Sequence, residues 1–349
     1  MTCSRLVIFV PLLGIAIGLC AVAAPSRPAP ADNAAANQAA DPSSAQEAYA
    51  IPQGAKVERD IVYAKVAGQD LHLDLYTPAE ARGPLPVIVW IHGGGWTMGD
   101  KGQCPAVWLT AHGYVVASVE YRLAPRFTWP AQIQDCQAAV RFLRANANAK
   151  KFGLDGSHIG AWGASAGGHL AVLLGVLGEN SPIPATDRHG DSPAESGNET
   201  VSSRVQAVCD WFGPTWLAEV QNNNAVEALL GGPVSKNRQK AEQASPLTYV
   251  AAGDPPMLIM HGKADTIVPV AASRALYAAL RKVGVEAQLE IIPGAGHGAA
   301  GIINPQTMAT VRQFFDAHLK NQPASQPASP DRVSGKPLDS AHGGSTKAK

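Results

Sequence analysis

A series of short apolar runs, separated by segments of helical periodicity, is the feature that most restricts the fold of this chain. The runs are nearly continuous, as expected for strands of a sheet covered on both faces. They are residues 86–91, 114–119, 159–162, 205–212, 257–260 and 287–292, and the helical patterns between them are residues 106–112, 130–147, 169–177 and 270–283. Strands and helices that alternate in this way predict an α/β fold with a mostly parallel central sheet flanked by helices.

The segment before these runs has a different pattern. Residues 60–75 alternate polar and apolar side chains, which predicts an antiparallel N-terminal hairpin at the edge of the sheet. We assign the folded domain to residues 51–320, a length that suits one α/β domain. The composition of the 349 residues, 46% hydrophobic and 16% charged, agrees with a globular domain of this size.

The N-terminus has the organisation of a signal peptide over residues 1–23. Arg5 precedes an apolar stretch, and Ala21-Val22-Ala23 forms a cleavage site. A lipoprotein anchor at Cys20 is disfavoured because Leu19 is bulky where a small residue is wanted. We therefore expect a secreted or periplasmic protein with no stable membrane insertion after cleavage.

Two further segments lack the apolar content of a packed domain. Residues 24–50 and 321–349 are rich in small and polar residues, which predicts a disordered leader and a disordered tail. The 28 basic and 28 acidic residues give a net charge of zero, which argues against nucleic acid as a partner.

The cysteine pattern argues against a metal site. Loss of Cys3 and Cys20 with the signal peptide leaves Cys104, Cys136 and Cys209, which lack metal-binding spacing. We expect no metal and no cofactor. A disulfide between Cys104 and Cys136 and a set of buried free thiols both remain open.

Ser165 stands in a stretch of small residues. The motif Gly163-Ala164-Ser165-Ala166-Gly167 follows an apolar run and precedes a helical pattern. A strand that turns directly into a helix needs small residues where the two backbones approach, and the residue at the turn is then exposed. Ser165 is therefore a candidate nucleophile, and the alternative is a small-residue packing site that happens to contain a serine.

Other chemically useful groups follow the ends of other predicted strands. The loop His92-Gly93-Gly94-Gly95-Trp96 can direct backbone N–H groups toward a developing oxyanion, although a plain glycine turn is the alternative. It lacks the Gly-Lys-Ser/Thr of a phosphate loop. Asp265 follows residues 257–260, and His297 stands between glycines after residues 287–292.

The choice of carboxylate depends on the edge of the sheet at which it lies. Asp265 lies beyond its strand, where a carboxylate can receive an imidazole N–H, or can simply cap the next helix. Asp254 precedes its strand and falls at the wrong edge, and Asp210 belongs to a Cys-Asp-Trp-Phe run typical of a core. The order Ser165, Asp265, His297 is that of the nucleophile-elbow hydrolases.

These motifs give the chain a resemblance to the α/β-hydrolase fold. It resembles the BD-FAE group of feruloyl and acetyl carbohydrate esterases, near the bacterial hormone-sensitive-lipase-like esterases. The segments that carry the resemblance are HGGGWTMGDK (92–101), YRLAPRFTWPAQIQDC (121–136), GASAGGHLA (163–171), DWFGPT (210–215), PPMLIMHGKADTIVP (255–269) and PGAGHG (293–298). Ala164 stands where the lipase branch usually has Asp, and the large helical cap of that branch is absent, which favours the carbohydrate-esterase branch.

The resemblance implies a serine esterase that acts on a small-molecule or carbohydrate ester by an acyl-enzyme mechanism. Ser165 would be the nucleophile, His297 the general base and Asp265 the residue that orients the imidazole. The resemblance also implies an oxyanion hole made of the backbone N–H groups of Gly94, Gly95 and Ala166. Aromatic residues from the strand-end loops would line the substrate pocket, with core packing as the alternative; these are Trp96, Trp211 and Phe212.

The polar insert at residues 179–203 is expected to form a flexible rim. A serine peptidase of the prolyl-oligopeptidase type shares the fold and the residue order, but the residues before the domain are too few to form its propeller. A non-catalytic hydrolase-like binding protein would have no need of all three residues Ser165, Asp265 and His297.

Overall fold

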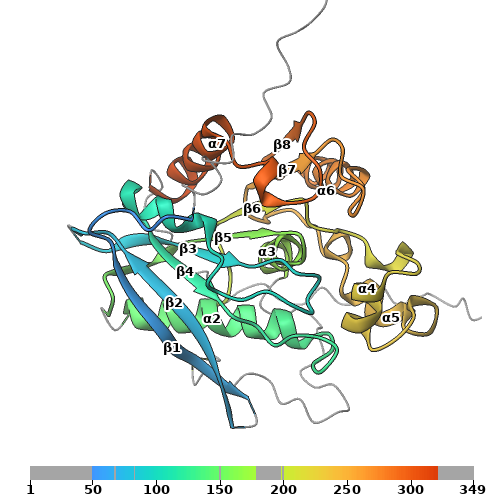
Figure 1. The fold of residues 1–349 in the computed structure, drawn as a ribbon, viewed down its shortest axis with the longest axis horizontal. Coiled ribbons are helices and arrows are strands. Elements are labelled where there is room, and N and C mark those ends of the chain that lie inside the picture. The colour runs from blue at the N-terminus through green and yellow to red at the C-terminus, as the bar shows by residue number, and fades with distance from the viewer. Residues whose placement is uncertain are drawn as a thin grey trace, which may run out of the picture. The chain divides into compact units, whose positions relative to one another are not determined.

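The computed structural model describes residues 49–66, 68–81, 83–148, 151–177, 198 and 200–320. These residues form an eight-stranded sheet with the order β1-β2-β4-β3-β5-β6-β7-β8 (Figure 1). β1 pairs antiparallel with β2, and β2 with β4, whereas the neighbouring pairs from β4 to β8 are parallel. The strands are β1 (Lys56–Val66), β2 (Gln69–Thr77), β3 (Leu85–Ile91), β4 (Val115–Val119), β5 (Leu154–Ala164), β6 (Ala207–Trp211), β7 (Met257–Gly262) and β8 (Ala287–Ile292).

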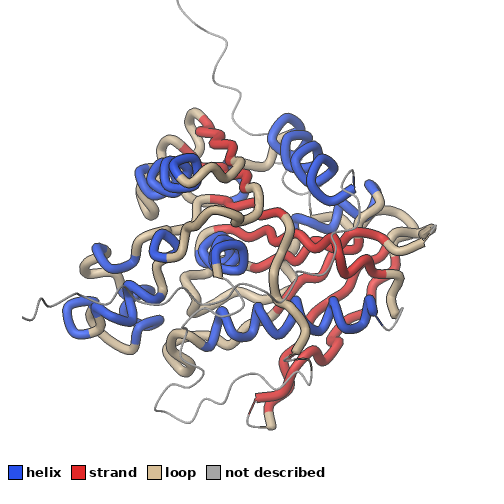
Figure 2. The backbone as a smooth tube through the Cα atoms, turned by 180° about the vertical axis from the view of Figure 1, so that it is seen from behind, coloured by secondary structure: helices blue, strands red, loops and turns tan. Residues whose placement is uncertain are grey.

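Helices cover both faces of this sheet (Figure 2). α2, α3 and α6 pack on one face, and the 3-10 helix η1 and α7 pack on the other. The α-helices are α2 (Ala131–Asn148), α3 (Ala166–Val176), α4 (Asn224–Leu230), α5 (Arg238–Gln243), α6 (Ala271–Lys282) and α7 (Pro305–Phe315). The shorter helices are η1 (Pro105–His112), η2 (Leu217–Glu219), η3 (Val234–Lys236), η4 (Pro246–Thr248), η5 (Ala299–Gly301) and the π-helix η6 (Asp316–Lys320).

Burial on both faces explains the continuous apolar runs. In β3, Val87, Val89 and Ile91 face α2 and α3, whereas Ile88 and Trp90 face η1 and α7. Every second residue of the strand therefore reaches a different core, and both cores must be apolar. The predicted α/β fold, with its mostly parallel sheet and antiparallel N-terminal hairpin, is confirmed.

The three cysteines that the structure describes are free thiols. Cys104, Cys136 and Cys209 are all buried and unpaired. Cys136 lies in the core on the α2 side of the sheet and Cys104 in the core on the η1 side. The sheet therefore separates Cys104 from Cys136, and the two form no disulfide.

Several predictions fall outside the described residues. They concern the signal peptide at 1–23, nearly all of the leader at 24–50, the tail at 321–349 and most of the insert at 179–203, and they stay predictions. Among the residues that the structure does describe, no helix is both long enough and apolar enough to cross a membrane. The same residues contain no cluster of three or more His, Cys, Asp or Glu side chains suited to a metal ion.

Candidate active site

Ser165 occupies the sharp turn between β5 and α3. Its backbone has φ 55° and ψ −119°, a conformation that side-chain-bearing residues rarely adopt. A Cβ atom on Gly163 would overlap the carbonyl of Gly167, and a Cβ atom on Gly167 would overlap the carbonyl of Ile91. The small residues are therefore required by the close approach of β5, α3 and β3, as the sequence predicts.

The structure joins Ser165, His297 and Asp265 in one hydrogen-bonded chain. The Ser165 hydroxyl donates to His297 Nε2 over 3.0 Å, and His297 Nδ1–H donates to Asp265 Oδ2 over 2.8 Å. Asp265 Oδ1 accepts the backbone N–H groups of Ile267 (2.8 Å) and Val268 (2.9 Å). Burial alone would raise the pKa of the Asp265 carboxyl, but the hydrogen bonds from His297, Val268 and Ile267 lower it below its ordinary value. Asp265 is therefore ionised at neutral pH.

The two other carboxylates considered from the sequence lie elsewhere. Asp210 is buried on β6, its Oδ1 accepts Gly213 N–H over 2.9 Å, and burial raises its pKa to about 7. Asp254 accepts Ala251 N–H in the turn before β7. Neither carboxylate is hydrogen-bonded to His297, whose Nδ1 is directed at Asp265.

A cavity of about 880 Å³ opens beside Ser165. One wall comes from the connection between β6 and β7 and another from residues 267–275, and both are largely apolar. Gly95, Trp96 and Ala166 complete the lining next to Ser165, and Glu219 adds a carboxylate. The cavity can therefore hold a sizeable, mostly apolar group against the serine.

The glycine loop after β3 is held in a tight turn. Gly94 and Gly95 have φ values of 111° and 57°, which side chains disfavour, and the Gly94 carbonyl accepts N–H from Thr97 and Met98. Gly95 lines the cavity, as does Ala166, which begins α3, where backbone N–H groups lack helical partners. Gly94 is not among the residues that line the cavity.

Residues 73–280 match the BD-FAE family. The chain belongs to this family. Esterase LipC from Mycobacterium tuberculosis is 32% identical to it over 224 residues, which cover 62% of this chain and 53% of LipC. The chain spans about half the length of the curated relatives it matches.

Solved structures extend the likeness over more of the chain. A carbohydrate esterase from gut microbiota, solved in truncated form, superposes with a TM-score of 0.68 at 30% identity, covering 76% of this chain and 97% of that one. The esterase Est2 from Thermogutta terrifontis, solved with butyrate bound, gives a TM-score of 0.62 at 26% identity, covering 78% and 97%. The predicted resemblance to the BD-FAE esterases is confirmed.

Trp96 of this BD-FAE chain lines the cavity, and a histidine holds its ring. Trp96 Nε1–H donates to His169 Nδ1 over 3.3 Å, and His169 Nε2–H donates to the Ala244 carbonyl over 2.6 Å. Burial lowers the pKa of His169 to about 4, so the ring is neutral and one nitrogen is free to accept. His169 belongs to α3, so the helix that follows Ser165 also fixes the loop after β3.

The expectation that Trp211 and Phe212 line the pocket is corrected. Trp211 packs edge-on against Trp90 and Trp162 in the core on the η1 and α7 side of the sheet. The Phe212 ring is buried against the His297 imidazole, with the ring centroids 4.8 Å apart. Trp216, which sequence reasoning missed, lines the cavity instead.

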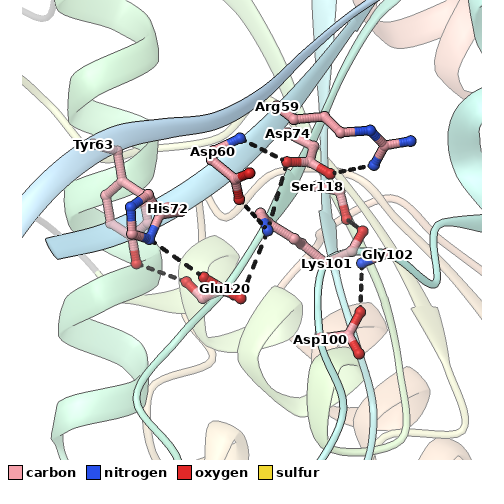
Figure 3. Close-up of polar contacts among 10 residues, drawn as sticks. All are labelled: Arg59, Asp60, Tyr63, His72, Asp74, Asp100, Lys101, Gly102, Ser118 and Glu120. Atoms are coloured by element: carbon pink, nitrogen blue, oxygen red, sulfur yellow. Dashed lines mark hydrogen bonds and ion pairs between the residues drawn. The ribbon is translucent and has the colours of Figure 1, made fainter.

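A polar cluster ties the far end of the glycine loop to the edge hairpin (Figure 3). Lys101 Nζ lies 2.8 Å from Asp60 on β1, 3.6 Å from Asp74 on β2 and 3.7 Å from Glu120 after β4. The Lys101 carbonyl accepts the hydroxyl of Ser118 on β4. The loop that begins at His92 is therefore fastened at its other end to three parts of the sheet edge.

The neighbouring carboxylates favour the charged form of Lys101. Burial by itself would lower the pKa of Lys101, but the hydrogen bond to Asp60 and the charges of Glu120 and Asp74 raise it. Asp74 is almost fully buried and also pairs with Arg59 over 2.9 Å. Loss of the Lys101 ammonium would therefore leave a buried carboxylate with one partner fewer.

Proposed function

We propose that this BD-FAE protein is a serine esterase that hydrolyses carboxylic esters through an acyl-enzyme. The observation that carries the proposal is the continuous hydrogen-bonded chain from Ser165 through His297 to Asp265, placed at the edge of an apolar cavity. The named esterases among its relatives support the same reaction. Domains of this fold serve many reactions, so the site rather than the fold supports the assignment.

The proposed first step is attack by Ser165 Oγ on the ester carbonyl. His297 Nε2 takes the hydroxyl proton, while the ionised Asp265 keeps the other ring proton on Nδ1. We propose the backbone N–H groups of Gly94, Gly95 and Ala166 as donors to the oxyanion of the tetrahedral intermediate, each contributing about 3–4 kcal/mol. Gly95 and Ala166 line the cavity, whereas Gly94 does not. His297 then gives its proton to the leaving alcohol, and water hydrolyses the acyl-enzyme by the same path.

The substrates we propose are short acyl esters or carbohydrate-linked and feruloyl esters. The cavity volume of about 880 Å³ and its largely apolar walls are compatible with a short acyl chain or an aromatic acyl group. Trp216, which is only partly buried, can offer its ring to an aromatic group or a sugar. A carbohydrate esterase and an esterase with bound butyrate are among the structural neighbours.

Turnover of p-nitrophenyl acetate by the purified protein tests the reaction. The Ser165→Ala variant should lose the activity and any covalent labelling by a fluorophosphonate, at an unchanged melting temperature. A panel of acetylated xylan, methyl ferulate and p-nitrophenyl butyrate then tests the substrate class. A wild-type protein that neither turns over an activated ester nor reacts with the fluorophosphonate would favour the binding-protein alternative.

We also propose that the protein is exported, because of the signal-peptide pattern at residues 1–23. The intact mass of the protein recovered from the periplasm or the medium measures cleavage. A mature N-terminus at Ala24 or Pro25 is the expected result, and an uncleaved cytoplasmic protein would contradict it.

A further inference from the structure

A second histidine lies against Asp265, on the side away from His297. His261 is at the end of β7, and its side chain is fully buried. Its Nε2 lies 2.9 Å from the Val268 carbonyl oxygen and 3.1 Å from Asp265 Oδ2. Its Nδ1 lies 2.7 Å from Ser273 Oγ on α6. Nothing in the sequence distinguished His261 or Ser273 as part of the site.

The surroundings of the ring decide where its proton lies. A backbone carbonyl can only accept, so the nitrogen that faces Val268 carries the hydrogen. Burial lowers the pKa of His261, so the ring is neutral and its Nδ1 has a free lone pair. The Ser273 hydroxyl must then be the donor to Nδ1. Ser273 thereby holds the tautomer in which His261 Nε2–H is directed at Val268 and Asp265.

His261 acts on Asp265 in two ways. The positive end of its N–H dipole lies beside Oδ2, the same oxygen that accepts from His297. It also holds the carbonyl of Val268, whose own N–H donates to Asp265 Oδ1. The turn that carries the carboxylate is therefore braced from β7 and, through Ser273, from α6.

We propose that His261 and Ser273 are positioning residues that hold Asp265 for its hydrogen bond to His297, so that five side chains rather than three set the geometry of the site. The proposal rests on the proposed function, because it assigns the two residues to the same reaction. Among the described residues, the charged or titratable groups that face His261 are Asp265 and His297. The hydroxyl of Ser273 and the ring of Phe212 complete its surroundings.

The test compares His261→Leu, which removes both ring nitrogens, with His261→Gln, whose amide can keep a donor near the Nε2 position. We expect His261→Leu to lower kcat about tenfold with KM within about twofold, because one hydrogen bond next to a charged group is lost. His261→Gln should recover most of kcat. A residue that only stabilised the fold would lower the melting temperature and leave kcat of the folded protein unchanged.

The pH profile gives a second readout. Without His261, Asp265 is held less firmly for its hydrogen bond to His297 and therefore stabilises the positive form of the imidazole less. The acid limb of kcat/KM, which reports the coupled Asp265–His297 pair, should therefore move to lower pH by about one unit. Ser273→Ala should shift kcat and the acid limb in the same directions and by less. Thr110→Val is the matched control, because it removes a buried hydroxyl that donates over 2.8 Å to the Val107 carbonyl within η1, on the other side of the sheet from α6. This variant should change neither kcat nor the acid limb.

A measurement on the wild-type protein keeps the test independent of how the variants fold. Nitrogen-15 NMR of the labelled histidines should show the His261 ring protonated on Nε2 and unprotonated on Nδ1 at neutral pH. The opposite tautomer, or unchanged kcat and acid limb in His261→Leu, overturns the proposal. If the wild type is an active esterase with either result, only the role of His261 and Ser273 falls. If it hydrolyses no ester and takes no fluorophosphonate, the proposed function falls as well.

Discussion

Replacement of Asp265 by Asn is the most informative perturbation, because every polar contact of this carboxylate is a donor. Oδ1 accepts two backbone N–H groups, from Ile267 and Val268. Oδ2 accepts His297 Nδ1–H and lies 3.1 Å from His261 Nε2. An asparagine must turn its NH₂ group toward one of these two sets of donors.

The two placements of the amide have unequal consequences. The backbone N–H groups cannot change their protonation, so an NH₂ facing them leaves donors opposed on the Oδ1 side. The His297 ring can instead move its proton from Nδ1 to Nε2 and accept from the NH₂ group, while His261 Nε2–H keeps the Val268 carbonyl as its acceptor. We therefore expect Asp265→Asn to fold with His297 in the tautomer that cannot take the Ser165 proton.

The expected loss in kcat is about 10⁴-fold, equivalent to about 5.5 kcal/mol of activation free energy, as for other triads with the wrong tautomer. The assay is kcat on p-nitrophenyl acetate, with circular dichroism and thermal melting to establish folding. Asp254→Asn and Asp210→Asn serve as matched carboxylate controls and should lose far less. If Asp265→Asn keeps more than a tenth of wild-type kcat, or if folded Asp210→Asn is the crippled variant, the assignment of the acid is wrong.

Three further outcomes are expected. Lys101→Met should cost about 1–2 kcal/mol of unfolding free energy and lower kcat, since Asp74 loses a cation, and Lys101→Arg should recover both in melting and ester assays. Asp210 has a folded pKa of about 7 against an ordinary 3.8, so it destabilises the protein as pH rises between these values. Denaturant unfolding should show a loss of about 3 kcal/mol from pH 5 to pH 8 that Asp210→Asn lacks. Deletion of residues 321–349, a polar segment, should leave the thermal midpoint and kcat unchanged.

The sequence was most informative where one local rule dominates. Continuous apolar runs reveal strands buried on both faces, and parallel strands bring the residues after their carboxyl ends to one edge. Ser165, Asp265 and His297 could therefore be selected by position in the chain alone. The role of the glycines around Ser165 could also be predicted, because a close backbone contact excludes a side chain whatever the rest of the sequence contains.

The side of the sheet on which Trp211 lies could have been predicted from the sequence. Along β6, Ala207, Cys209 and Trp211 belong to one core and Val208 to the other, as the two-residue period of a strand requires. Trp211 therefore had to point to the same side as Cys209. Being near the end of a strand did not place its side chain in the site.

Other features depend on tertiary contacts that no local pattern contains. The short helices between residues 213 and 256 have too few turns for a clear hydrophobic period, and α4 is marked mainly by the Asn223 side chain that caps it. His261 looked like an ordinary strand residue, since its partner Ser273 lies on a helix that meets it only after folding. The order of the strands in the sheet is likewise a matter of long-range pairing.

The connection between β6 and β7 supplies a cavity wall without supplying Ser165, Asp265 or His297. Its helices α4 and α5 lie together beyond α3 in Figure 1, and most of its residues between Pro214 and Val226, with Leu247, line the cavity. Substitutions at the cavity-lining positions of this segment are therefore expected to alter substrate preference while Ser165, Asp265 and His297 stay in place. A library confined to those lining positions would vary the shape of the cavity without changing the reacting side chains.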